Sequence, residues 1–179
     1  MMLIFVVIGL LFGFARGGNL SHTEKELPEG IVLPVLAFVT EFIAVRFLYF
    51  PEWVQLNLVY FLLFWFVFRN RDRGAWPLWF GLGTLLNYIV IAANGYRMPV
   101  LPSLMAGLPE SVTESLINGE VFGYTLADSG TRLVFLGDVI AVPFLGEFVG
   151  FASVGDFFLG IGVGLLAYRL TRPRRIGKL

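Results

Sequence analysis

The sequence predicts an all-α membrane protein, a single transmembrane domain over residues 1–179 that forms a helical bundle of five spans. Three observations predict this class. Of the 179 residues, 57% are hydrophobic and 15% are charged, whereas a soluble domain carries about 25% charged residues. The mean hydropathy is +0.79. The apolar residues also fall into runs near the roughly 20 residues that a membrane-spanning helix requires.

Composition also excludes several classes of function. The formal net charge is zero, so no basic surface for nucleic acid is expected. The chain has no cysteine and one histidine, which excludes disulfides, thiolate zinc sites and multi-histidine metal or haem sites. We therefore expect no metal, no cofactor and no nucleic-acid partner; the expected surroundings are the lipid bilayer.

Four predicted spans occupy the first half of the chain. The first, residues 1–18, could instead be a cleaved signal peptide, but no basic residue precedes its apolar run, as a signal peptide requires. The next three follow separate apolar runs, at 31–50, 53–68 and 76–94.

Residues 97–131 differ from these runs because they contain several prolines, glycines and glutamates. We expect them to form an outer loop. Ser111 and Glu114 have the spacing of a capping box, and Gly119 is a plausible helix stop. The sequence therefore predicts a short amphipathic surface helix at about 111–118.

The last apolar stretch, 133–168, is too long for one straight span. Its 36 residues would make a helix of about 54 Å, against a bilayer core of about 30 Å. We expect 132–152 to enter and leave the membrane on one side as a re-entrant segment, followed by a span at 154–170. The alternative is a sixth span at 132–150.

Basic residues predict the orientation, because they concentrate on the cytoplasmic side. Arg69, Arg71 and Arg73 lie in one loop, and several arginines follow position 168. This places the N-terminus and residues 97–131 outside, and the C-terminus in the cytoplasm.

Two charged residues fall inside the predicted second span, Glu41 and Arg46. A charge in the membrane costs about 2.5–3.5 kcal/mol on insertion scales. The two residues are five positions apart and do not share a helix face. We interpret them as ties to other helices, with a transport role as the alternative.

Further polar residues map to the outer half of the membrane in this topology. Asp138 follows an apolar run, and Asp156 has the position of a helix start, where a carboxylate offsets the helix dipole. Arginines at the same depth could pair with them or bind an anionic head group. The expected polar cluster, or ligand site, comprises Asn87, Asn94, Arg97, Arg132, Asp138 and Asp156.

Several strings together carry a resemblance to a known family. NGYRMPV begins at Asn94, TRLVFLGDVIAVP at Thr131 and SVGDFFLGIGV at Ser153, and the earlier FARGGNL also fits. The chain resembles a family of small, uncharacterised bacterial membrane proteins whose usual first motif is NGGRMPV, so that Tyr96 is a departure. The resemblance implies a multi-pass protein of the bacterial cytoplasmic membrane and supplies no chemistry.

A fainter resemblance is to lipoprotein signal peptidases, small membrane proteins with two catalytic aspartates near the outer face. Asp138 and Asp156 imitate that arrangement, but the Asn-x-x-Asp-Arg and Asn-x-Ala-Asp signatures of that family are absent around them. The likeness implies at most that the two aspartates could form a catalytic pair.

Three functional hypotheses follow. The first is a non-catalytic membrane protein whose outward-facing polar pocket binds a small ligand, a lipid head group or a partner subunit of a membrane complex. The second is an intramembrane aspartyl hydrolase that uses Asp138 and Asp156, one as acid and one as base. The third is a membrane-embedded component of a transporter.

Overall fold

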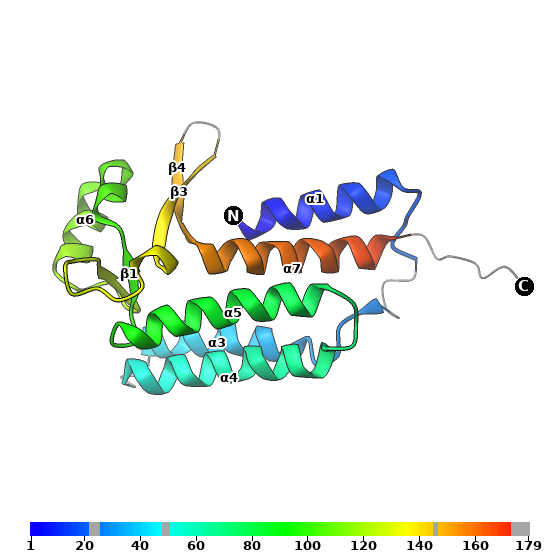
Figure 1. Cartoon of the computed structure of the whole chain (residues 1–179), viewed down its shortest axis with the longest axis horizontal. Coiled ribbons are helices and arrows are strands. Elements are labelled where there is room, and N and C mark those ends of the chain that lie inside the picture. Colours follow the sequence, from blue (N-terminus) through cyan, green and yellow to red (C-terminus); the bar gives the residue numbers. More distant parts are fainter. Residues whose placement is uncertain (22–25, 48–50, 145–146, 173–179) are drawn as a thin grey trace, which may run out of the picture.

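The computed structural model describes residues 1–21, 26–47, 51–144 and 147–172, apart from the side chains of 44–47, 107 and 143–149. Five long helices pack along one another, and a small sheet with a short helix lies at one end of them (Figure 1). Each long helix closely matches a range expected to span the membrane. These helices are α1 (Met2–Ala15), α3 (Val32–Phe47), α4 (Glu52–Asn70), α5 (Trp76–Ala93) and α7 (Val154–Thr171).

Only part of the expected membrane topology is supported by helix length. In the part of the chain that is described, α5 and α7 are long and apolar enough to cross a membrane. α1, with 14 residues, and the stretch Val32–Ile43 of α3 are apolar but shorter. The described helices therefore include two candidate spans, and five full spans are not supported by this criterion.

The expectation of an all-α fold is wrong at one end of the bundle, where four strands form a sheet in the order β2-β1-β3-β4. β1 pairs in parallel with both β2 and β3, and β3 pairs antiparallel with β4. The strands are β1 (Met98–Val100), β2 (Tyr124–Leu126), β3 (Asp138–Phe144) and β4 (Glu147–Ser153).

The described residues of 132–152, all but 145 and 146, therefore form no spanning helix, and the alternative of a sixth span at 132–150 is wrong. They form a 3₁₀ turn, η2 (Val134–Leu136), followed by the β3–β4 hairpin. Hydropathy alone does not distinguish an apolar strand pair from a helix. The β-branched residues Val139, Ile140 and Val142 favour the strand.

The short helix expected within segment 97–131 is confirmed as α6 (Glu110–Ile117), of which only Leu116 is buried. It follows a 3₁₀ segment, η1 (Pro102–Gly107). The expected capping box of Ser111 is wrong, because the helix begins directly after Pro109 and no side chain caps it. Gly119, with a φ of +69°, lies just beyond the end of the helix, as a C-terminal glycine commonly does.

Glycines allow α1 and α7 to pack at close range. A Cβ atom built on Gly9 would overlap the backbone carbonyl of Gly164, and one on Gly13 would overlap the side chain of Thr171. Gly9 and Gly13 are four residues apart, the spacing by which small residues let membrane helices approach. The α1–α7 contact therefore depends on the absence of side chains.

The sheet is joined to the bundle by a small apolar core. Leu56 and Tyr60 of α4, Val90 and Ile91 of α5, and Met98 of β1 are all buried and pack together. Because Met98 belongs to β1, one of the two inner strands, this core fixes the sheet on the ends of α4 and α5.

A substitution at Gly9 tests the close helix contact. We expect Gly9→Val to lower the free energy of unfolding by about 1–3 kcal/mol, the usual cost of overpacking, or to prevent folding. Leu11→Val, on the same helix at a side chain that is 61% exposed, is the matched control and should change stability little. Thermal unfolding in detergent measures both, and an unchanged Gly9→Val variant would contradict the packing described.

Candidate functional site

A hydrogen-bonded junction links the start of α7 to α5. The Ser153 hydroxyl accepts from the Asp156 backbone N–H at 2.9 Å, and the Asp156 carboxylate accepts from the Ser153 N–H at 3.0 Å. These reciprocal bonds form a capping box, with the carboxylate at the positive end of the helix dipole. The helix start expected at Asp156 is therefore confirmed.

Asn87 of α5 completes this junction. Its side-chain N–H donates to the Asp156 carboxylate at 2.9 Å, and its carbonyl oxygen accepts from the Ser153 hydroxyl at 2.8 Å. A Cβ on Gly155 would overlap the Asn87 side chain, so the glycine permits this approach. Both carboxylate oxygens of Asp156 are thus held in fixed positions.

Asp138 lies beside the junction and lacks such support. It is the first residue of β3, opposite Ser153 in the hairpin register, and is 5% exposed. Its backbone carbonyl accepts from the Leu101 N–H at 3.0 Å. Its carboxyl group, by contrast, makes no ion pair and no side-chain hydrogen bond with any residue that the structure describes, and its oxygens keep some contact with solvent.

The surroundings of Asp138 favour its protonated form. Burial, and secondly the charge of Asp156, raise the pKa of Asp138 from its ordinary value of 3.8 to about 7. Asp138 can therefore take up or release a proton near neutral pH. Asp156 differs from it in geometry, because each of its carboxyl oxygens accepts a hydrogen bond.

The hydroxyl of Tyr124 in β2 lies within electrostatic range of the same carboxylates. Although the residue is 39% exposed, burial of its hydroxyl and then the charges of Asp138, Glu41 and Asp156 raise the pKa of Tyr124 to about 12. The hydroxyl consequently stays protonated. It can donate a hydrogen bond at a site where the neighbouring charges are negative.

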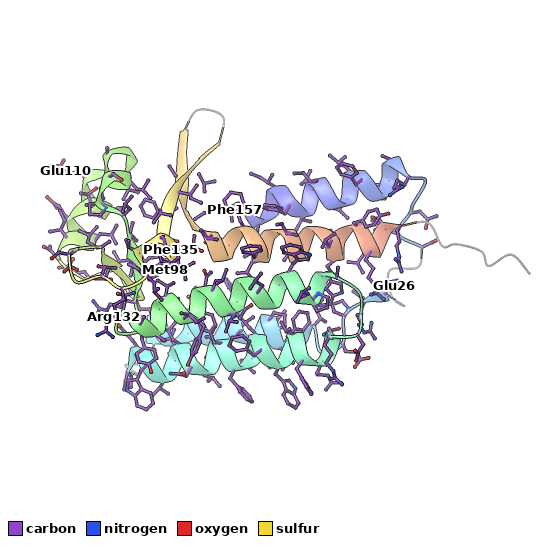
Figure 2. All side chains as sticks on the ribbon, viewed as in Figure 1. Glu26, Met98, Glu110, Arg132, Phe135 and Phe157 are labelled. Atoms are coloured by element: carbon purple, nitrogen blue, oxygen red, sulfur yellow. The ribbon has the colours of Figure 1, made fainter. Side chains whose placement is uncertain are left out.

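Neither arginine of the expected cluster pairs with Asp138 or Asp156 among the residues that the structure describes. Arg97 forms a bidentate pair with Glu52, at 2.8 and 2.7 Å, and this pair raises the pKa of Arg97. The Asn94 side chain accepts from the backbone N–H of Arg132 at 2.9 Å and donates to its carbonyl at 2.8 Å. Arg132 is exposed at the sheet end of the molecule (Figure 2).

The structure therefore divides the expected cluster into two groups. Asn87, Asp138 and Asp156 lie together at the base of the hairpin, joined by Ser153. The bonds between Asn94 and Arg132 and the pair of Arg97 with Glu52 tie segment 97–132 to the ends of α5 and α4. The expected ion pair between an arginine and Asp138 or Asp156 is absent from the described residues.

Sequence reasoning finds Ser153 at the helix start but misses its hydrogen bond to Asn87, and it misses Tyr124 and Glu52 altogether. Ser153 was readable as part of the helix start, since its spacing from Asp156 is that of a cap. Tyr124 and Glu52 gave no local signal, because they meet their partners only through the tertiary fold. No cluster of three or more metal-binding side chains occurs among the described residues.

The charges expected within the second span are only partly described. The Glu41 backbone carbonyl accepts from the Gln55 side chain at 3.4 Å, and the Gln55 side-chain oxygen is buried without a partner in the described structure. The Arg46 side chain lies outside the described residues. The role of both charges as ties between helices stays a prediction.

Comparison with known proteins identifies a family. The family model described as "Family of unknown function (DUF5317)" matches residues 23–168. Because the match covers most of the chain, the protein belongs to this family, which confirms the resemblance to an uncharacterised family. No curated protein and no solved structure matches the chain.

The raised pKa of Asp138 predicts a pH-dependent stability. Asp138 ionises near 3.8 when unfolded and near 7 when folded. Its contribution to the free energy of unfolding is therefore full below about pH 4 and is lost as the pH rises to about 7, by on the order of a few kcal/mol. Asp138→Asn should remove this loss and become more stable relative to wild type as the pH rises. Glu120→Gln, at an exposed position, is the control. If the free energy of unfolding of wild type and of Asp138→Asn changed with pH in parallel, Asp138 would not have the raised pKa of a buried carboxyl.

Proposed function

We propose that this protein is a multi-pass protein of the bacterial cytoplasmic membrane that binds a small cationic ligand, or the cationic part of a lipid head group, on its outer side. The observation that carries the proposal is the buried, unpartnered carboxyl of Asp138 beside the fixed carboxylate of Asp156. Neither aspartate has a basic partner among the described residues.

The lipid environment is supported by the surface of the helices. Large apolar side chains point away from the bundle on all five long helices, at exposed fractions between 41% and 74%. Soluble monomers rarely expose such a surface, and α5 and α7 have the length of spans. The examples are Leu3, Phe12, Phe38, Phe61, Leu78 and Phe157.

The proposed orientation is supported by the two ends of the bundle. The sheet and α6 lie at one end, and the loop after α4 and the end of α7 lie at the other (Figure 1). Ion pairs link the loops at this second end: Arg73 to Glu29 at 2.8 Å and Arg169 to Glu26 at 2.7 Å. By the positive-inside rule this end is cytoplasmic, and the sheet is outside.

In this proposal α1, α3, α4, α5 and α7 all cross the membrane, with the N-terminus outside and the C-terminus inside. The 14 residues of α1 give about 21 Å, so the bilayer would thin locally around it. The open edge of the sheet carries backbone groups that hydrocarbon cannot satisfy. We therefore place the β3–β4 hairpin in water or head groups rather than as a re-entrant segment.

A cationic ligand suits the site because its uncompensated charge is negative. Three carboxyl groups, on Asp138, Asp156 and Glu41, act on the Tyr124 hydroxyl, while Arg97 is held by Glu52. A buried carboxyl without a partner either keeps a proton or binds a positive group. A proton and a cation should therefore compete for Asp138.

An aspartyl hydrolase is the second candidate. The favouring observation is that Asp138 can hold a proton near pH 7 beside a second carboxyl, as catalytic carboxyl pairs do. The bonds from Asn87 and Ser153 to Asp156 would then orient its oxygens. The test is whether the purified protein cleaves a lipoprotein or a lipid. Cleavage by the wild type that is abolished in a folded Asp138→Asn variant would establish a hydrolase in place of simple binding.

Ligand binding can be tested on the purified protein in detergent. We expect ethanolamine to raise the melting temperature at pH 8, and less at pH 5, because a proton then occupies Asp138. Asp138→Asn should abolish the increase, and Glu120→Gln should retain it. Stabilisation by glycerol phosphate and none by ethanolamine would contradict a cation site.

The orientation can be tested by labelling single cysteines in this cysteine-free chain. Ser129 and Asp72 are exposed residues near opposite ends of the bundle. A membrane-impermeant thiol reagent added to intact cells should modify Ser129→Cys, and should modify Asp72→Cys only after the membrane is opened. The reverse pattern would overturn the orientation, and labelling of both would contradict membrane crossing.

A further inference from the structure

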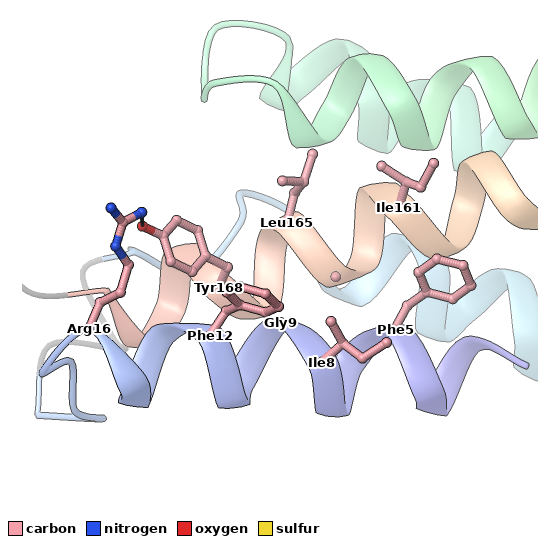
Figure 3. A pocket seen from close by; sticks show the side chains of 9 residues that line it. Phe5, Ile8, Gly9, Phe12, Arg16, Ile161, Leu165 and Tyr168 are labelled. Atoms are coloured by element: carbon pink, nitrogen blue, oxygen red, sulfur yellow. Dashed lines mark hydrogen bonds between the residues drawn. The ribbon is translucent and has the colours of Figure 1, made fainter.

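A groove of about 360 Å³ lies between α1 and α7, away from the Asp138 site (Figure 3). Its volume falls within the roughly 300–1,000 Å³ of typical ligand pockets. The walls are apolar: Phe5, Ile8 and Phe12 come from α1, and Ile161 and Leu165 from α7. Gly9 and Gly164, where the two helices are in close contact, form part of the lining.

One end of this groove is polar. Arg16, at the end of α1, donates to the Tyr168 hydroxyl of α7 at 3.4 Å. The Arg16 side chain is exposed and has no carboxylate partner among the described residues. Arg169, one residue beyond Tyr168, is by contrast paired with Glu26. The groove is thus apolar along its length and ends at Arg16, a positive charge with no carboxylate partner among the described residues.

The length of the groove matches one leaflet of a membrane. Phe5 and Arg16 are eleven residues apart in sequence, which corresponds to about 17 Å along a helix, roughly half of a bilayer core of about 30 Å. The groove follows the helix axes (Figure 3), and hence the direction of lipid chains if these helices span.

We infer that this groove binds an acyl chain of an anionic phospholipid, whose phosphate contacts Arg16 and Tyr168. The inference rests on the proposed membrane insertion, and it does not depend on the ligand of the Asp138 site. In the proposed orientation Arg16 lies on the cytoplasmic side, where clusters of basic residues between helices bind anionic head groups. The tyrosine hydroxyl is placed to donate to the same phosphate.

The test compares two lipids with the same acyl chains, phosphatidylglycerol and phosphatidylcholine, added to the purified full chain in detergent. Lipid retained by the protein is measured by native mass spectrometry. We expect phosphatidylglycerol to be retained preferentially. Arg16→Gln should weaken its binding by about fivefold, the effect of one basic residue near an anionic surface, and should leave phosphatidylcholine unchanged.

Two further variants separate the parts of the site. Arg71→Gln removes an exposed arginine at the same end of the bundle, next to Asp72, and should keep the lipid preference. Ile8→Trp places a larger side chain in the groove at a residue that is 46% exposed. It should reduce retention of both lipids without loss of helical content by circular dichroism.

Each outcome is decisive. The inference would be wrong if Arg16→Gln and Arg71→Gln lost the preference for phosphatidylglycerol equally. It would also be wrong if Ile8→Trp retained as much lipid as the wild type, or if glycerol phosphate were retained as strongly as the whole lipid. Failure of the proposed function looks different. A chain that is extracted from membranes without detergent would not be inserted at all, whereas a chain that needs detergent but shows no lipid preference would refute only this inference.

Discussion

The position of the β3–β4 hairpin relative to α5 and α7 depends on the hydrogen-bonded junction of Asn87, Ser153 and Asp156. Four bonds of 2.8–3.0 Å connect these three side chains and the backbone of α7. Gly155 and Gly83 let α5 and α7 approach closely enough for them to form. The junction fixes where α7 begins, and therefore where β4 ends. Since Asp138 is the register partner of Ser153, the same bonds determine where Asp138 is buried.

The junction also explains why Asp138 and Asp156, which lie close together in the fold, differ in their hydrogen bonding. Asp156 has hydrogen-bond donors for both oxygens, and its place in the structure is explained by helix capping. Asp138 carries the cost of burial without a donor or a positive partner in the described structure, which is why its pKa rises to about 7. An expensive buried group that the fold does not satisfy is a reasonable place to look for a ligand. Arg97 is paired with Glu52 and forms no ion pair with either aspartate.

Features that depend on residues close together in the sequence were predictable, and features that depend on distant residues were not. Hydropathy predicted the long helices, and the spacing of Ser153 and Asp156 predicted the start of α7, because both signals are local. The sheet was missed, since its inner strand β1 pairs in parallel with segments 26 and 38 residues away. The same limit explains the arginines: Glu52 lies 45 residues from Arg97, and no pattern linked them. Asn87 and Asn94 do not share one site, also for a tertiary reason. The Asn94 side chain bonds to the backbone of Arg132, whereas that of Asn87 bonds to Ser153 and Asp156.

The central claim is that Asp138 carries a proton near neutral pH and yields it to a positive ligand. Infrared difference spectroscopy measures this directly, because protonated and ionised carboxyl groups absorb separately. The account predicts a carboxylic-acid band that titrates near pH 7, is absent in Asp138→Asn, and disappears when ethanolamine is added at neutral pH. A wild-type protein in which no carboxyl group titrates above about pH 5 would contradict it, because every carboxyl would then have an ordinary pKa.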